Sequence, residues 1–328
     1  MIELTGLHKA YGAQTILSDA SLAVRAGESI ALVGTNGSGK TTTLRCAVGL
    51  ARADGGRVAI DGIDMAARPC DARARLSYLA QRTCFPATLT VREILSMVAE
   101  LRRTDVHAVA REISLCGLSH VAGRTVGRLS GGEAQRLAIA ALFIPDAAAY
   151  LLDEPTMNLD PSGVRLLVDR LAAARRDGRA ILFTTHATAE LEELATAVAV
   201  LRNGRISPVT EGTLPGERHL SMVIEGNPDV WLDAALRNGA RRAWPRRSRL
   251  HVLIADGAVS ALLARLESDG ARVVNYRSET VLSAALERLN EEEHHDAVVR
   301  PHSVERCVAA GRLWHGASWA RADTVGPR

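Results

Sequence analysis

The sequence predicts an α/β protein with a parallel-sheet core, followed by a smaller α+β unit. Three observations lead to this prediction. A Gly-rich turn at 34–41 joins an apolar, β-like run to a helix-compatible run. Two further apolar runs, 147–153 and 180–186, end in polar residues. This is typical of buried parallel strands whose carboxyl ends form a ligand-binding edge. From residue 218 on, strand-like and helix-like segments alternate.

Length and composition indicate a soluble globular chain of about two domains. Of the 328 residues, 47% are apolar and 23% are charged, and the net charge of +3 is too small to indicate a nucleic-acid partner. The longest apolar stretch, 137–152, is interrupted by Pro145, so no segment approaches the ~20 unbroken residues that cross a bilayer. The N-terminus has no secretory pattern, and the five scattered cysteines contain no C-x-x-C pair. We therefore expect reduced thiols in a cytosolic protein.

The turn at 34–41 is typical of a phosphate-binding loop. It matches G-x-x-x-x-G-K-[ST] at every position, between a strand-like and a helix-like run. Its backbone N–H groups and the positive end of the helix dipole favour an anion. Lys40 is one of two lysines in an arginine-rich chain, which indicates a need for a compact ammonium at β/γ-phosphates. The Thr41 hydroxyl can ligate Mg²⁺. A Gly-rich turn without a ligand is the alternative, and the strand and helix on its flanks argue against it.

Short strands are expected before this loop, at 2–4, 20–24 and 30–33, with glycines between them. Tyr11 falls in a loop between the first two. Its ring either packs locally or stacks on a base, and the phosphate loop downstream favours stacking.

Between the loop and residue 116 the pattern changes from strand to helix. Residues 55–62 favour a strand that ends in a turn, and 76–81 favour an apolar strand that ends at Gln81. Gln81 is either an ordinary strand-end residue or one whose amide oxygen serves Mg²⁺ or a water. Apolar residues at helical spacing predict helix over 90–116.

A second anion site is predicted at the helix start after Leu129. Ser130 and Glu133 form the S-x-x-E capping box. A cap alone does not need Gly131 and Gly132, which cost helix stability in the first turn. The two glycines do let a bulky anionic group approach the exposed N–H groups. We therefore interpret this segment as a second phosphate-type site.

The apolar run 147–153 ends in two acids, Asp153 and Glu154. Burying adjacent carboxylates is costly unless a cation or a reaction uses them. Asp153 is placed to hold Mg²⁺, and Glu154 to polarise an attacking water. The alternative is a pair of solvated acids at a strand end. His186 ends the run 180–186, and a lone histidine there is unremarkable, but parallel strands would bring it to the same edge.

In their order, these motifs resemble those of the nucleotide-binding subunits of ABC transporters, over residues 1 to about 212. The matching motifs are the aromatic A-loop (Tyr11), the Walker A loop (Gly34 to Thr42), the Q-loop (Gln81), the signature Leu129-Ser-Gly-Gly-Glu, the Walker B end (Asp153-Glu154), the D-loop (Asn158-Leu-Asp160) and the H-loop (His186).

The resemblance implies an ATPase whose cofactors are ATP and Mg²⁺. The nucleotide-binding residues would be Tyr11, Gly34, Thr35, Asn36, Gly37, Ser38, Gly39, Lys40, Thr41 and Thr42, together with Ser130, Gly131, Gly132 and Asp160. The metal ligands would be Thr41, Gln81 and Asp153. The catalytic residues would be Glu154 as general base, with His186, Gln81 and Lys40. Because the signature residues would complete the site of a second subunit, two ATP molecules would lie between two head-to-tail copies.

The resemblance also implies a P-loop NTPase fold with an N-terminal antiparallel β part and a helical subdomain at about 85–145. Its partners would be a separate transmembrane permease subunit and a second ATP-binding subunit in a homodimer, at the inner face of the cell membrane. No nucleic-acid partner is expected.

Two departures from the family pattern leave every catalytic position in place. Asn158 replaces a glycine common in relatives, and asparagine tolerates the left-handed backbone that glycine would supply. Ala195-Thr196 replaces a common Asp-Arg pair, which removes an ion pair after the H-loop.

The back third begins with an expected linker at 213–217, followed by a small α+β unit at 218–293. The order β-α-β-β-α-β, typical of a ferredoxin-like unit, follows if 242–247 forms an edge strand around Pro245. Similar units occur on nucleotide-binding subunits of ABC exporters, a fold-level analogy that favours export.

Two further segments have competing interpretations. The basic cluster 241–249 either meets anionic lipid or the membrane subunit, or is a solvated edge that prevents strand pairing. The tail 294–328 contains four histidines and one cysteine, but their spacing fits no common metal-ligand pattern, and we expect it to be disordered.

The function predicted from the sequence is the ATP-binding and hydrolysing subunit of an ABC transporter, with export favoured. The alternative is a soluble ABC ATPase acting on nucleic acid or ribosomes. Such relatives usually carry a long coiled-coil insertion or two fused ATPase domains, and this sequence has neither. A P-loop kinase or GTPase would leave the Ser130-Gly-Gly signature and Gln81 unexplained.

Overall fold

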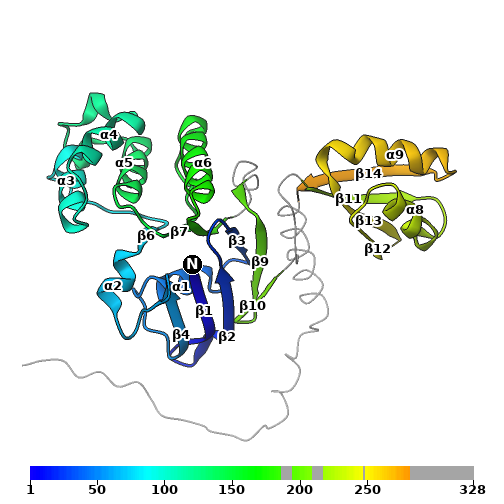
Figure 1. Ribbon diagram of the computed structural model, residues 1–328, viewed down its shortest axis with the longest axis horizontal. Coiled ribbons are helices and arrows are strands. Elements are labelled where there is room, and N and C mark those ends of the chain that lie inside the picture. The colour runs from blue at the N-terminus through cyan, green and yellow to red at the C-terminus, as the bar shows by residue number, and fades with distance from the viewer. Residues whose placement is uncertain (186–193, 209–216, 247, 281–328) are drawn as a thin grey trace, which may run out of the picture. The chain divides into compact units, whose positions relative to one another are not determined.

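A computed structural model describes residues 1–185, 194–208, 217–246 and 248–280 (Figure 1). Three sheets organise this part of the chain. Their strand orders are β2-β1-β4-β5, β10-β9-β3-β8-β7-β6 and β12-β13-β11-β14. Within the described residues, no helix combines the length and apolar character needed to cross a membrane.

The six-stranded sheet positions the candidate site. Its strands are β3 (Ser29–Val33), β6 (Leu76–Leu79), β7 (Ala149–Asp153), β8 (Ala180–Thr184), β9 (Ala197–Arg202) and β10 (Arg205–Pro208). All neighbouring pairs are parallel except β9 and β10. Every residue of β3, β7 and β8 is buried, which explains why these strands are apolar without alternation. The predicted parallel-sheet core is thus confirmed.

The N-terminal sheet is antiparallel, which confirms that part of the predicted fold class. It contains β1 (Ile2–Tyr11), β2 (Gln14–Val24), β4 (Gly55–Ile60) and β5 (Ile63–Asp64). The predicted strands at 2–4 and 20–24 were too short, because β1 extends to Tyr11 and β2 begins at Gln14. The first of them continues because Gly6 does not end β1. Gly6 lies at a register shift with φ of 55°, and its N–H donates to Ser21 Oγ at 2.8 Å, so the strand continues through a bulge.

The helices divide between the two faces of the six-stranded sheet. They are α1 (Lys40–Ala47), α2 (Pro69–Ala74), α3 (Val91–Leu101), α4 (His107–Leu115), α5 (Gly131–Phe143) and α6 (Pro161–Arg176), with short 3₁₀ turns η1 (Ser119–Val121) and η2 (Val126–Arg128). Alternate residues of β7 separate the cores: Tyr150 packs with residues of α3 to α6, and Leu151 packs with residues of α1 and β1. The helix predicted over 90–116 is two helices, the first capped by Thr90.

The third sheet has its own apolar core and the predicted β-α-β-β-α-β order. Its elements are β11 (Glu217–Ile224), η3 (Pro228–Trp231), α8 (Leu232–Arg237), β12 (Arg242–Arg246), β13 (Arg249–Ala255), η4 (Asp256–Ala258), α9 (Val259–Ser268) and β14 (Val273–Thr280). All its pairings are antiparallel, and β12, which contains Pro245, is an edge strand as expected.

One predicted boundary needs correction. Glu217, expected to belong to the linker, is the first residue of β11 and pairs with Ala255. The remaining linker residues, 213–216, and the tail, 294–328, lie outside the described residues, as does the whole segment 281–293 after β14, which was expected to complete the α+β unit.

Candidate nucleotide-binding site

The phosphate loop connects β3 to α1, and two of its glycines are required by the surrounding structure. Gly39 has φ of 108°, and a Cβ there would lie 2.7 Å from Ile16 Cγ2. A Cβ on Gly34 would lie 2.7 Å from the Leu201 carbonyl oxygen. Both contacts are far shorter than van der Waals distance, so a side chain at either position would force β2 or β9 away.

The loop is folded around the Lys40 side chain, which is only 6% exposed. Its ammonium donates hydrogen bonds to the carbonyl oxygens of Gly34 at 2.7 Å and Thr35 at 3.0 Å. Burial lowers the pKa of Lys40, and the negative charges of Glu154 and Asp153 oppose that shift. The ammonium therefore lies within electrostatic reach of both acids, in surroundings that favour a further anion.

The remaining predicted loop residues are on the same turn. Thr35, Asn36, Gly37, Ser38, Thr41 and Thr42 all fall between the end of β3 and the first turn of α1. The Ser38 N–H donates to the Thr35 carbonyl at 3.1 Å, which closes the turn. The Ser38 hydroxyl is buried without a hydrogen-bond partner in the described part of the chain. A buried hydroxyl of this kind is a group that a bound ligand could satisfy.

The carboxyl end of β7 carries the two acids, and its neighbour β8 holds them. Asp153 is 2% exposed, and its Oδ1 accepts a hydrogen bond from Thr184 Oγ1 at 2.8 Å. The same Thr184 oxygen accepts the N–H of Glu154 at 2.9 Å. Thr184 was not among the predicted site residues. The sequence signal that could have identified it is a hydroxyl near the end of the buried run 180–186. Thr184 can hold both acids because it lies opposite Asp153 in the register of β7 and β8.

Gln81 follows β6, the strand beside β7, and reaches the second acid. Its Nε2 donates to Glu154 Oε2 at 2.8 Å and lies 3.8 Å from Met157 Sδ. With the amide nitrogen engaged, the amide oxygen remains as an acceptor or ligand. Glu154 has φ of 49°, a left-handed conformation that costs free energy in a non-glycine residue and is common at functional sites. Lys40, Gln81, Asp153 and Glu154 therefore lie together at this edge of the sheet, and their catalytic and metal-binding roles stay predictions.

Of the predicted nucleotide contacts Tyr11 and His186, the structure describes only Tyr11. Tyr11, expected in a loop, is the last residue of β1 and pairs with Gln14. Its ring is half exposed, with Lys9 Nζ 5.1 Å from the ring centroid, and Lys9 also pairs with Asp54 at 3.0 Å. His186 lies outside the described residues, so its role stays a prediction.

The signature segment starts α5 with a complete capping box. The Glu133 N–H donates to Ser130 Oγ at 3.2 Å, and the Ser130 N–H donates to Glu133 Oε2 at 2.8 Å. A Cβ placed on Gly131 or Gly132 would meet nothing within 4 Å, so this chain's own packing does not require glycine at either position. Among the described residues, no hydrogen bond or ion pair joins 130–132 to the loop at 34–41.

The D-loop is linked to the signature helix by Arg136, which was not among the predicted site residues. Arg136 of α5 donates from Nη2 to Asp160 Oδ1 at 2.9 Å and to Ser162 Oγ at 2.6 Å. The Asp160 carboxylate also caps α6 by accepting the Gly163 N–H at 3.0 Å. Hydrogen bonds from Ser162, and then from Arg136 and Gly163, lower the pKa of Asp160. Asn158 has φ of 61°, the conformation for which asparagine is suited.

Comparison with known proteins places these motifs in a family. The family model described as ABC transporter matches residues 17–157. A daunorubicin resistance ATP-binding protein of Streptomyces coeruleorubidus is 31% identical over 287 residues, which are 83% of this chain and 89% of that protein. A Nod factor export ATP-binding protein of Burkholderia orbicola is 35% identical over 208 residues, which are 62% of this chain and 68% of that protein.

Solved structures agree with the fold. An ATP-binding subunit of an ABC transporter has a TM-score of 0.60 and 28% identity, and the match covers 64% of this chain and 90% of that one. A dimeric ATP-binding cassette in a post-hydrolysis state, bound to ADP and Pi, has a TM-score of 0.57 and covers 64% of this chain and all of that one. At 22% identity, the second match supports the fold alone. The sequence motifs, the loop around Lys40 and these relatives lead to one conclusion: the chain belongs to the ABC transporter family, as an ATP-binding subunit with ATPase activity.

Proposed function

We propose that two copies of this chain bind two ATP molecules head to tail and drive export through a separate membrane subunit. The observation that carries the proposal is the convergence of Lys40, Gln81, Asp153 and Glu154 at the carboxyl ends of β3, β6 and β7. Among the described residues, no hydrogen bond or ion pair joins 130–132 to the loop at 34–41, which supports a role for the signature residues toward a second copy.

In this proposal the phosphates of ATP bind to the amides of the loop at 34–41 and to Lys40. The Lys40 ammonium is already within the loop and close to two acids, so a phosphate would replace its bonds to carbonyl oxygens with stronger, charge-assisted ones. The half-exposed Tyr11 ring is available to stack on the adenine.

The donor set at the ends of β6 and β7 fits Mg²⁺, which prefers hard oxygen ligands. The proposed ligands are the Thr41 hydroxyl, the Gln81 amide oxygen and the Asp153 carboxylate. Because Gln81 Nε2 donates to Glu154, the amide oxygen of Gln81 is the atom that can bind a metal. Bound Mg²⁺ would neutralise charge on the β/γ-phosphates.

Glu154 is proposed as the general base that polarises the attacking water. It accepts a hydrogen bond from Gln81, and its backbone N–H is held by Thr184, so the carboxylate is oriented from two neighbouring strands. A base oriented in this way contributes roughly 10²–10⁴-fold to a hydrolysis rate. His186 is proposed to contact the γ-phosphate.

The second copy would complete each site with Ser130, Gly131 and Gly132. The open surroundings of the two glycines support this role, because a partner's phosphate could approach the amides of the first turn of α5. Asp160 is proposed to act at the same interface, linked to α5 through Arg136.

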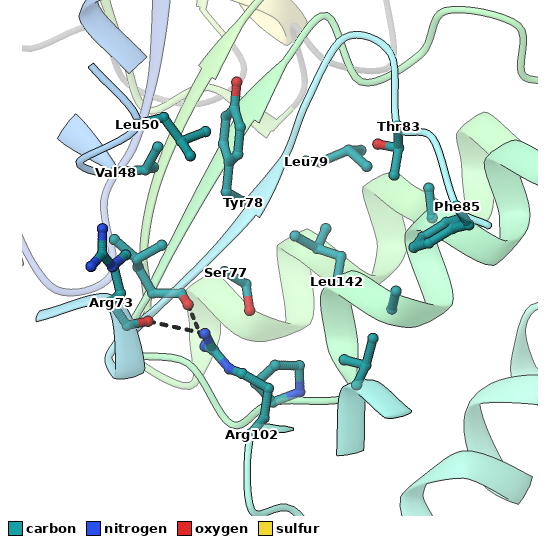
Figure 2. Close-up of a pocket in the computed structure, with 15 residues that line it drawn as sticks. Val48, Leu50, Arg73, Ser77, Tyr78, Leu79, Thr83, Phe85, Arg102 and Leu142 are labelled. Carbon is teal, nitrogen blue, oxygen red and sulfur yellow. Dashed lines mark hydrogen bonds between the residues drawn. The ribbon is translucent and has the colours of Figure 1, made fainter. Parts of the chain in front are cut away.

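Export is supported by the relatives, one named for daunorubicin resistance and one for Nod factor export. The membrane subunit is proposed to contact the groove beside the Q-loop and α3, which Thr83, Phe85 and Val98 help to line (Figure 2). That contact would hold the chain on the inner face of the cell membrane, without a nucleic-acid partner.

The test is the variant Glu154→Gln in the full chain. ATP binding should be retained, turnover should fall by roughly 10²-fold or more, and an ATP-dependent dimer should accumulate in size-exclusion chromatography. Glu100→Gln on the exposed face of α3 removes the same charge and should behave as wild type. Undiminished hydrolysis by Glu154→Gln would exclude Glu154 as the base, and a monomer in the presence of ATP would exclude the composite site.

A further inference from the structure

A groove of about 320 Å³ lies at the free edge of the six-stranded sheet (Figure 2). Among the described residues β6 is the last strand of that sheet, so one of its edges has no strand beside it. The groove wall is largely apolar, and Leu50, Leu79, Phe85 and Leu142 contribute to it. Leu50 is 67% exposed, so apolar surface continues out of the groove.

Arg102 is one of the few polar residues in this wall. Its guanidinium turns toward β6 and donates to the carbonyl oxygens of Arg73 at 3.0 Å and Leu76 at 2.5 Å (Figure 2). A guanidinium has five N–H donors, and these two bonds leave about three of them without a partner among the described residues. Burial lowers the pKa of Arg102, and no acid opposes that shift.

The other shielded arginines of the helical layer are paired, which makes Arg102 unusual. Arg170 binds the buried carboxylate of Glu112, and Arg136 binds Asp160. No carboxylate of the described residues lies within salt-bridge distance of Arg102 or of Arg73, the second cation of the groove. A partly buried cation without a counter-ion is costly, and an incoming carboxylate would relieve that cost.

A further polar group is also unsatisfied. The Ser77 hydroxyl lines the groove, is 5% exposed, and has no hydrogen-bond partner in the described part of the chain. An arginine with free donors and a buried free hydroxyl, both set in an apolar wall, together fit a ligand that is apolar with one acidic group.

We propose that the segment of the membrane subunit that docks in this groove carries an acidic side chain that pairs with Arg102, beside apolar side chains that fill the groove. This inference rests on the proposed function and adds the chemistry of the partner. A volume of about 320 Å³ is at the lower end for small-molecule sites, and the apolar rim at Leu50 extends the contact surface beyond it. Both features favour side chains of a docked protein segment, such as a helix laid in a groove.

The test places a photoreactive residue at the rim. Leu50 is replaced by p-benzoylphenylalanine in the full chain, which is then irradiated in membranes of cells that produce the transporter. The expected product is a cross-link to a membrane-spanning protein, at a peptide with Asp or Glu within about one helical turn of the attachment point. Arg102→Glu should lower the yield about tenfold, and exchanging the partner's acid for Lys should restore it in that variant.

Arg92→Glu is the matched control, because Arg92 is an exposed arginine on the same helix, α3. It should leave the yield unchanged. Arg102→Gln removes the charge, and a thermal melt of this variant shows whether it still folds. A reduced cross-link yield from a folded Arg102→Gln protein supports the pairing. A cross-link only to lipid, no cross-link, a partner peptide without an acid, or an undiminished yield in Arg102→Glu would each overturn the inference. ATP hydrolysis by the purified wild-type chain, measured without membranes and compared with Glu154→Gln, distinguishes these failures from failure of the proposed function, because the ATPase site is then tested without the membrane subunit.

Discussion

Gln81 donates a hydrogen bond to Glu154 across 2.8 Å, which joins the end of β6 to the end of β7. Gln81 also begins the segment that leads to the groove wall at Thr83 and Phe85. The short segment from Gln81 to Phe85 therefore contacts the proposed general base at its first residue and lines the proposed docking surface at its last. A displacement of Thr83 or Phe85 by a docked partner would be transmitted to the orientation of the Glu154 carboxylate.

Gln81→Met tests that bond directly. Methionine keeps the length of the side chain and removes both the donor and the amide oxygen. We expect kcat for ATP hydrolysis to fall about tenfold or more, because Glu154 loses orientation. The affinity for ATP, measured by fluorescence titration, should change much less. A fall in affinity with unchanged kcat would contradict the orienting role.

Lys40→Met tests the phosphate loop through ligand-induced stability. ATP at 100 times its Kd should raise the free energy of unfolding of the wild type by about 2.7 kcal/mol. The variant lacks the ammonium at the loop and should gain almost nothing at the same ATP concentration. Thermal melts with and without ATP measure the difference. An equal ATP-induced shift in both proteins would rule out Lys40 as a phosphate ligand.

Gly132→Ala separates the signature from the folding of its own chain. A Cβ there meets nothing within 4 Å, and alanine is favoured over glycine in a helix by up to about 1 kcal/mol, so the variant should be at least as stable as wild type. Its ATPase activity should nevertheless fall about tenfold or more, because the added methyl group would obstruct a partner's phosphate.

Gly123→Ala is the control for that prediction, since its Cβ also meets nothing within 4 Å and it lies outside the proposed interface. Denaturant unfolding and steady-state hydrolysis would be measured on both variants. If Gly132→Ala hydrolyses ATP at the wild-type rate, no ligand approaches this helix start closely.

Glu112→Gln tests how α4 is held to α6. Glu112 is fully buried and pairs with Arg170, whose guanidinium lies over the Phe143 ring with its carbon 4.1 Å from the centroid. Removing one charge of a buried pair leaves the other uncompensated, which typically costs about 3–5 kcal/mol. Urea denaturation should show a loss of this size. The double variant Glu112→Gln/Arg170→Met should recover part of it, and no recovery would mean that the packing of the two side chains, not the charge pair, carries the stability.

The sequence predicted well what depends on local pattern. The loop at 34–41, the buried acidic strand end and the Ser130 cap are each encoded by a few neighbouring residues, and the structure has all three. The parallel order of β3, β7 and β8 followed from apolar runs that need burial on both faces.

Features that depend on distant residues were not predictable in the same way. Thr184 and Arg136 act through partners 31 and 24 residues away, at Asp153 and Asp160, so no local spacing marks them. The continuation of β1 through Gly6 depends on pairing with β2, which overrides the tendency of glycine to end a strand.

The hydrogen bonds of Lys40 to Gly34 and Thr35 have a consequence for the speed and cost of substrate capture. A lysine that is free in water loses up to about 2 kcal/mol of rotational freedom when it is fixed. Here that loss accompanies folding of the chain. An arriving triphosphate would therefore meet a cation that is already in position. The ammonium would exchange its carbonyl acceptors for phosphate oxygens, and no further side-chain entropy would be lost on binding.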